Sequence, residues 1–142
     1  MTHNPRVLIL CTGNSARSQM AEGLLRHDGA GKFDVASAGT HPGVVRAEAV
    51  EVMREVGIDI SAHRSKSVDE FTEQEFDFVI TVCDNANEHC PVFAGHATRI
   101  HKSFEDPPAS GVGDDEMRLA VFRRVRDEIR QWLRSFVVEH WS

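Results

Sequence analysis

The hydrophobic positions of this chain follow two patterns that alternate along it. Short runs of consecutive apolar residues are typical of buried strands, and apolar residues three or four positions apart are typical of helices with one covered face. The apolar runs predict strands over residues 6–11, 33–38, 77–83 and 98–101. The helical spacing predicts helices over residues 18 to about 27, over 46–56, and from Asp114 or Asp115 along an apolar stripe that reaches Phe136.

This alternation of strands and helices predicts the fold class. Strands separated by helices pair in parallel and build a doubly wound sheet. We therefore expect a single α/β domain over residues 1–142, with a four-stranded parallel sheet and helices on both faces, in three layers. Ligands of such sheets bind at the carboxyl ends of the strands. Because Cys11 and Cys83 both close a predicted strand, we expect their sulfurs at the same edge of the domain.

The segment after the first predicted strand has the composition of an anion-binding loop. It consists of a cysteine, five residues, an arginine and a serine, and it leads into a helix. Backbone N–H groups in such a loop can bind an anion at the positive end of the helix, and Arg17 adds a fork of donors for a tetrahedral oxyanion. Gly13 and Asn14 tolerate the unusual backbone angles that the loop needs. The predicted binding residues are Thr12, Gly13, Asn14, Ser15, Ala16, Arg17 and Ser18.

Cys11 stands at the start of this loop, where a nucleophile would face the bound anion. The positive field of the helix end and of Arg17 is expected to lower the pKa of the Cys11 thiol, so that it reacts as a thiolate. The alternative is a buried cysteine followed by an ordinary turn. Spacing, residue types and the strand–helix context together favour the nucleophile.

Two further cysteines, Cys83 and Cys90, lie on a polar segment after the third predicted strand. A disulfide requires Cα atoms about 4.4–6.8 Å apart, so these two can pair only if the segment bends. A labile disulfide of this kind suits redox exchange. The alternatives are structural thiols, or a metal held by Cys83, His89 and Cys90 with His96 or His101 recruited. Zinc sites usually have four ligands at tighter spacing, which disfavours the metal.

Asp106 precedes Pro107 on the loop after the last predicted strand. A carboxylic acid facing the anion site could protonate an oxygen leaving group. An Asp-Pro pair is also a common turn initiator, and the residues alone favour the turn.

Composition and charge exclude some functions. The net charge is −6 and the pI about 5.7, which argues against nucleic acid as a partner, because phosphate backbones bind basic faces. The longest apolar run near the start covers residues 7–10, too short for an export signal or a membrane span. Three cysteines would leave one over in a closed disulfide framework, so we expect a reducing, cytoplasmic location.

The loop from Cys11 to Ser18 resembles the signature of the low-molecular-weight tyrosine phosphatase fold. The longer segment 11–23 is more similar to the thioredoxin-coupled arsenate reductases on that fold. The resemblance covers nearly the whole chain, including 37–39, 63–67, 83–91 and Asp106-Pro107.

The resemblance implies a mechanism. Cys11 would attack arsenate held by Arg17 and the loop, with Asp106 as the acid and phosphate or sulfate as competing anions. Cys83 would attack Cys11 and release arsenite, and Cys90 would attack Cys83. Thioredoxin would reduce the final disulfide, no cofactor would be bound, and the protein would act as a monomer. The need for further thiols also follows from the chemistry, because reduction of arsenate consumes two electrons.

One position departs from the pattern of the relatives. Some of them bind a potassium ion beside the loop, and Lys66 stands here where an acidic ligand would be. We expect Lys66 to replace the cation, either by pairing with Glu22 or by bonding to the loop, so that Ser18, Glu22 and Lys66 support the loop. The alternative is a solvated surface lysine.

Two other functions fit parts of this pattern. A phosphatase needs only Cys11, Arg17 and Asp106; the chain has no tyrosine, and Pro108 stands where such phosphatases often have an aromatic residue after the acid. A non-catalytic oxyanion-binding module that senses redox state is the second. Glutaredoxin or a small thiol as reductant is disfavoured, because an internal cysteine pair makes an external adduct unnecessary.

Overall fold

The computed structural model describes residues 4–84, 90, 93 and 95–140. It contains one parallel sheet of four strands in the order β2-β1-β3-β4. The strands are β1 (Arg6–Cys11), β2 (Asp34–Gly39), β3 (Phe78–Thr81) and β4 (Thr98–His101). The helices are α1 (Arg17–Asp28), α2 (Ala47–Glu55) and α4 (Asp115–His140), with a 3₁₀ turn η1 (Val68–Glu70). These elements confirm the predicted α/β class with a four-stranded parallel sheet and helices.

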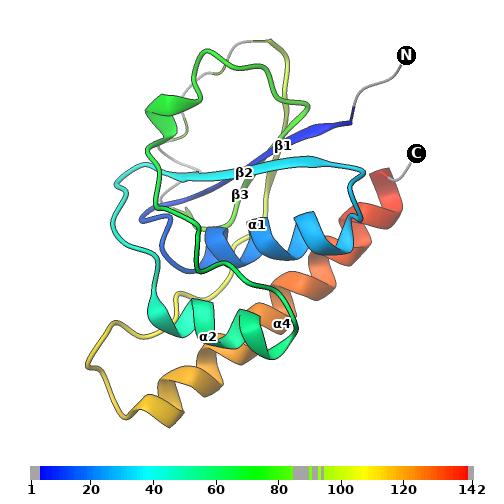
Figure 1. Ribbon diagram of the computed structural model, residues 1–142. Helices are drawn as coiled ribbons and strands as arrows, with labels where there is room; N and C mark the ends of the chain where they lie inside the picture. Colours follow the sequence, from blue (N-terminus) through cyan, green and yellow to red (C-terminus); the bar gives the residue numbers. More distant parts are fainter. Residues whose placement is uncertain (1–3, 85–89, 91–92, 94, 141–142) are drawn as a thin grey trace.

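The chain leaves β1 towards β2 on one side and returns to β3 and β4 on the other. The strand order therefore reverses between β1 and β3, and ligands bind at such a reversal, outside the carboxyl ends of the strands. Cys11 ends β1, and Cys83 follows β3 by two residues. In Figure 1 the helices α1, α2 and α4 lie on one side of the sheet and η1 on the other.

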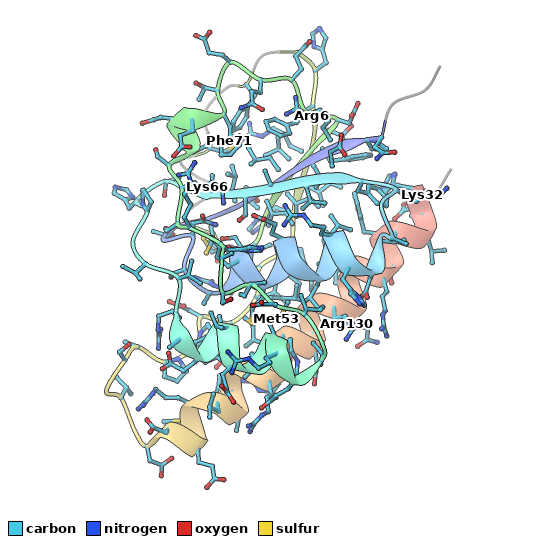
Figure 2. The ribbon with its side chains drawn as sticks, in the orientation of Figure 1. Arg6, Lys32, Met53, Lys66, Phe71 and Arg130 are labelled. Carbon is cyan, nitrogen blue, oxygen red and sulfur yellow. The ribbon has the colours of Figure 1, made fainter. Side chains whose placement is uncertain are left out.

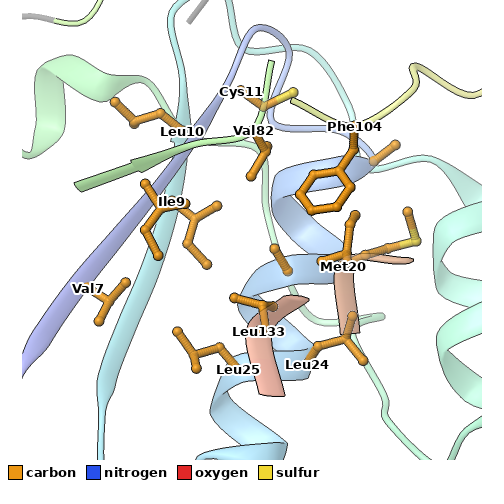
Figure 3. Packing of buried hydrophobic residues seen from close by; sticks show 14 of the residues in the cluster. Val7, Ile9, Leu10, Cys11, Met20, Leu24, Leu25, Val82, Phe104 and Leu133 are labelled. Carbon is orange, nitrogen blue, oxygen red and sulfur yellow. The ribbon is translucent and has the colours of Figure 1, made fainter. Parts of the chain in front are cut away.

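The core surrounds β1. Its residues Val7 to Leu10 are completely buried, and because successive side chains of a strand point to opposite faces, both faces of the sheet are covered. Figure 3 shows Leu25 and Leu133, from α1 and α4, below β1. The predicted apolar stripe of α4 is confirmed, because its members at helical spacing are buried: Phe122, Val125, Ile129, Leu133 and Phe136.

The bounds of β3 differ from the prediction. The strand was expected over 77–83 but covers Phe78–Thr81, the residues that pair in register with Val7–Leu10 of β1 and Thr98–His101 of β4. Backbone bonding continues one residue further: the Val82 N–H donates to the Leu10 carbonyl at 2.9 Å. The other predicted ends differ from the structure by one residue or not at all. The exception is the C-terminal end of α4, for which the sequence pattern sets no bound. Along the described part of the chain, no helix is both long and apolar enough to cross a membrane.

Candidate active site

The loop between β1 and α1 is tightly shaped. Asn14 has a φ of 48°, in the left-handed region that asparagine tolerates better than most residues. The expectation of unusual angles was wrong for Gly13, which keeps a negative φ; the carbonyl of Gly13 instead accepts bonds from the Ser65 hydroxyl at 2.8 Å and the Gly43 N–H at 2.9 Å. Gly39 lies against this loop, where a Cβ would be 2.5 Å from the Thr12 carbonyl oxygen.

Asn14 is the centre of the hydrogen bonds behind the loop, and its side chain is completely buried. Its amide nitrogen donates to the hydroxyls of Ser18 at 2.8 Å and Ser37 at 2.9 Å. Its amide oxygen accepts from Gln19 at 2.9 Å and from the Lys66 backbone N–H at 2.9 Å. All four bonding sites of the amide are thus used, which fixes the conformation of the loop.

Glu22 continues this network as a buried carboxylate with several positive neighbours. It accepts from the Ser37 hydroxyl at 2.6 Å and pairs with Arg26 at 2.8 Å. Lys66 Nζ lies 3.6 Å from Glu22 Oε1, with its side chain mostly covered, so the lysine is not a solvated surface residue. Figure 2 labels Lys66 near the end of β2. His63 Nε2 is 3.8 Å from Glu22, and burial lowers the pKa of His63 although Glu22 opposes the shift.

The two buried thiols meet at the edge of the sheet. Cys11 and Cys83 are thiols that form no disulfide; each is about 4% exposed, and their side chains are within hydrogen-bonding contact. The Thr12 hydroxyl lies 3.3 Å from the Cys83 sulfur. Figure 3 shows Cys11 beside Val82 and Phe104. Cys11 and Cys83 thus lie at the same edge of the sheet, as the sequence predicts.

The expected lowering of the Cys11 pKa is wrong for this arrangement. The contact with Cys83 and then burial raise the pKa of the Cys11 thiol above its ordinary value. The Arg17 guanidinium and the Thr12 backbone N–H oppose this shift without overcoming it. The prediction considered only the field of the loop, whereas a second thiol in contact favours the neutral form of Cys11.

Arg17 connects the anion loop to the segment after β4. Its side chain is about 11% exposed; Nη1 donates to the Phe104 carbonyl at 3.0 Å, and Nη2 lies 3.4 Å from Asp106 Oδ1. Asp106 is 75% exposed and so is open to solvent and ligands. The predicted acid and the predicted oxyanion ligand are therefore neighbours.

Cys90 is placed beside Arg99 on β4. Burial raises the pKa of the half-buried Cys90 thiol, and the charge and hydrogen bond of Arg99 oppose the shift. His89 and the rest of the stretch 85–89 lie outside the described residues. Among the residues that are described, no group of three or more His, Cys, Asp or Glu side chains is arranged to hold a metal ion.

Several residues of the site were missed by the sequence analysis. Arg46, at the start of α2, donates from its backbone N–H to the Ser15 carbonyl at 2.8 Å and from Nη2 to the Pro108 carbonyl at 2.9 Å, so it links the anion loop to the Asp106 segment. Ser37 could have been found as a polar residue within a buried strand. Gln19 has no local signal, His63 and Ser65 were included only in the segment 63–67 that carries the resemblance, and His101 was considered only as a metal ligand.

Comparisons with known proteins agree with this geometry. Residues 6–140 match the family described as low molecular weight phosphotyrosine protein phosphatase. An arsenate reductase of Halalkalibacterium halodurans is 45% identical over 130 residues, which cover 92% of this chain and 93% of that protein.

Solved structures give the same result. An arsenate reductase in the phosphate binding state superimposes with a TM-score of 0.76 at 33% identity, covering 95% of this chain and 98% of that one. A low molecular weight protein tyrosine phosphatase from T. tengcongensis gives 0.75 at 26% identity, covering 96% and 99%. The chain belongs to the low molecular weight phosphotyrosine protein phosphatase family.

Proposed function

We propose that this protein reduces arsenate to arsenite with three thiols that act in sequence. The contact between Cys11 and Cys83 at the oxyanion loop carries the proposal, because a phosphatase needs one thiol there and a reductase needs a second within reach. Similarity to arsenate reductases, one of them in a phosphate binding state, supports a tetrahedral oxyanion as the ligand.

In the first step the Cys11 thiolate attacks arsenic while Arg17 and the loop N–H groups bind the oxyanion. An S–As bond forms, the As–OH bond breaks, and Asp106 protonates the departing hydroxyl so that it leaves as water. The 3.4 Å approach of Arg17 to Asp106 supports a position for this carboxyl group beside the bound oxyanion. Arsenic remains As(V) at this stage, so no electron has yet been transferred.

In the second step Cys83 attacks the Cys11 sulfur. The S–As bond breaks, arsenic keeps its electron pair and leaves as arsenite, and the two sulfurs form a disulfide. Cys90 then attacks Cys83, which releases the Cys11 thiolate and leaves a Cys83–Cys90 disulfide. A dithiol protein of the thioredoxin class reduces that disulfide, so the protein itself needs no bound cofactor.

The decisive experiment follows NADPH consumption with arsenate, thioredoxin and thioredoxin reductase. We expect steady consumption by the wild type, and none beyond background by Cys83→Ser or Cys90→Ser. A wild type without consumption, or a Cys90→Ser protein that turns over repeatedly, contradicts the proposal. Arg54→Met, at an exposed residue of α2, is the matched control.

Phosphate ester hydrolysis is the second candidate, as a side activity of the same site. It is favoured by the family itself and by the neighbouring positions of Arg17 and Asp106, which phosphatase chemistry also requires. Hydrolysis of p-nitrophenyl phosphate that survives Cys83→Ser but not Cys11→Ser would assign it to the one-thiol reaction.

A further inference from the structure

His101, the last residue of β4, connects two parts of the chain around Cys83. Its Nδ1 lies 2.8 Å from the Thr81 hydroxyl, at the end of β3. Its Nε2 lies 2.8 Å from Asp84 Oδ1, the residue that follows Cys83. We propose that His101 is a positioning residue that holds Cys83 against Cys11 by binding Thr81 and Asp84 on either side of it.

The chemistry of the three groups determines their roles. A carboxylate only accepts hydrogen bonds, so Nε2 of His101 carries a proton and donates to Asp84. In the neutral ring Nδ1 is then the acceptor, and the Thr81 hydroxyl donates to it. Thr81 is 3% exposed and belongs to the sheet, whereas Asp84 is 78% exposed. The imidazole thus fixes the position of Asp84, the residue after Cys83, relative to Thr81 in the sheet.

The backbone of β3 supports only one side of Cys83 in this way. Sheet-like bonding reaches Val82, whose N–H donates to Leu10 at 2.9 Å and whose carbonyl accepts from Phe104 at 3.1 Å. Beyond Cys83, the Asp84 side chain bonds to His101. Cys83, whose sulfur also lies 3.3 Å from the Thr12 hydroxyl, is therefore flanked along the chain by two anchors, one made of backbone and one made of the imidazole.

This placement affects the proposed reduction, on which this part of the inference rests. The disulfide between Cys11 and Cys83 forms only if the second sulfur stays at the first while the arsenic is attached. The two hydrogen bonds of the His101 ring go to Thr81 and Asp84, and neither reaches the oxyanion loop or Arg17. Loss of the ring should therefore slow disulfide formation without weakening anion binding.

The first test needs no arsenate. Iodoacetamide reaches a buried thiol only through local opening, so the rate of Cys83 alkylation, followed by peptide mass spectrometry on the reduced protein, reports how well Cys83 is held. We expect His101→Ala to raise this rate about tenfold, because two hydrogen bonds are lost. Asp84→Asn, at an exposed side chain whose amide oxygen can still accept from His101, should raise the rate less. Cys83 alkylated at the wild-type rate in both variants would overturn the proposal.

A control and a rescue separate positioning from general loosening. His96→Ala removes another histidine from the segment before β4 and should leave the Cys83 rate unchanged. His101→Gln offers an amide that can accept from Thr81 and donate to Asp84, and should restore most of the protection. Equal acceleration by His96→Ala, or a His101→Gln rate equal to that of His101→Ala, would also overturn it.

The second test measures Cys11–Cys83 disulfide formation in a single turnover with arsenate, in a Cys90→Ser background. We expect about a tenfold slower rate with His101→Ala and a phosphate affinity for the Cys11 loop within about twofold of the parent. A rate equal to the parent's, or an equal loss of phosphate affinity, counts against positioning. If the parent itself forms no disulfide, the proposed reduction fails, while the alkylation result still decides the role of His101.

Discussion

At the scale of single residues, Cys11 shows how a second thiol changes the chemistry of an anion loop. Arg17 and the Thr12 N–H favour its thiolate, whereas Cys83 and burial favour its thiol, and the latter prevail. The contact with Cys83 therefore favours the thiol form of the proposed nucleophile, and the attack on arsenic proceeds through its thiolate fraction.

Removal of Cys83 should reverse the shift. We expect the pKa of Cys11 to fall in Cys83→Ala, because the contact that raises it is lost while Arg17 remains. The thiolate fraction at neutral pH then rises, and alkylation of Cys11 becomes faster at the same pH. The measurement is the pH profile of Cys11 alkylation, with Cys90→Ala as control. An unchanged or higher pKa in Cys83→Ala is the outcome that contradicts this.

Lys66 gives a second prediction at this scale. Because its ammonium group lies 3.6 Å from the buried Glu22, we propose that it takes the place of a bound cation. The midpoint of thermal unfolding should be the same in potassium and sodium chloride. Lys66→Met should cost about 1–2 kcal/mol of unfolding free energy, measured in urea, since Glu22 keeps Arg26 as a partner. A wild type stabilised specifically by potassium would refute the idea.

At the scale of elements, the sequence predicts what is local. Continuous apolar runs such as Val7–Leu10 identify the strands, and the loop before α1 is recognised because its cysteine, glycine and arginine stand together. The contacts between elements are not predictable in this way. Ser37 reaches Asn14 because β1 and β2 pair in register, and His101 reaches Asp84 because β4 ends beside β3. No local sequence pattern predicts either register.

Arg46 provides the test at this scale, since it joins the start of α2 to both the anion loop and the Asp106 segment. Arg46→Met removes the bond to Pro108 but keeps the backbone bond to Ser15. We expect arsenate-dependent oxidation of Cys11 to slow about tenfold through displacement of Asp106, with phosphate affinity largely kept. Single-turnover rates and phosphate protection of Cys11 measure the two effects, and Arg54→Met again serves as the control. Equal losses of the single-turnover rate and of phosphate affinity would contradict the proposed role of Arg46.

At the scale of the whole molecule, the long helix α4 is fastened to α1 by charge as well as by its apolar stripe. Asp28, at the end of α1, accepts two hydrogen bonds from Arg130, each 2.9 Å, and Arg134 lies 3.4 Å away. Burial raises the pKa of Asp28, but the bonds from Arg130 and His27 outweigh it and hold that pKa below its ordinary value.

The lowered pKa makes this contact sensitive to acid. A carboxyl group with a depressed pKa in the folded state stabilises the fold above its unfolded pKa, and this stabilisation is lost as the pH falls through the folded value. Asp28→Asn should therefore be less stable than the wild type at neutral pH, and the difference should shrink below about pH 4. Urea midpoints across this range measure it, with the exposed Glu139→Gln as control. A difference independent of pH would exclude the ion pair as its cause.

The shape of the anion loop depends on chain segments that are remote from it in sequence. Asn14 is bound by Ser37 and Lys66, the Gly13 carbonyl by Ser65, and Gly39 leaves room for the Thr12 carbonyl. A linear peptide with the sequence of this loop would therefore not keep its shape. A designer who wished to install this oxyanion site on another parallel sheet would have to transfer a neighbouring strand with its serine and glycine, together with a third segment that crosses behind them.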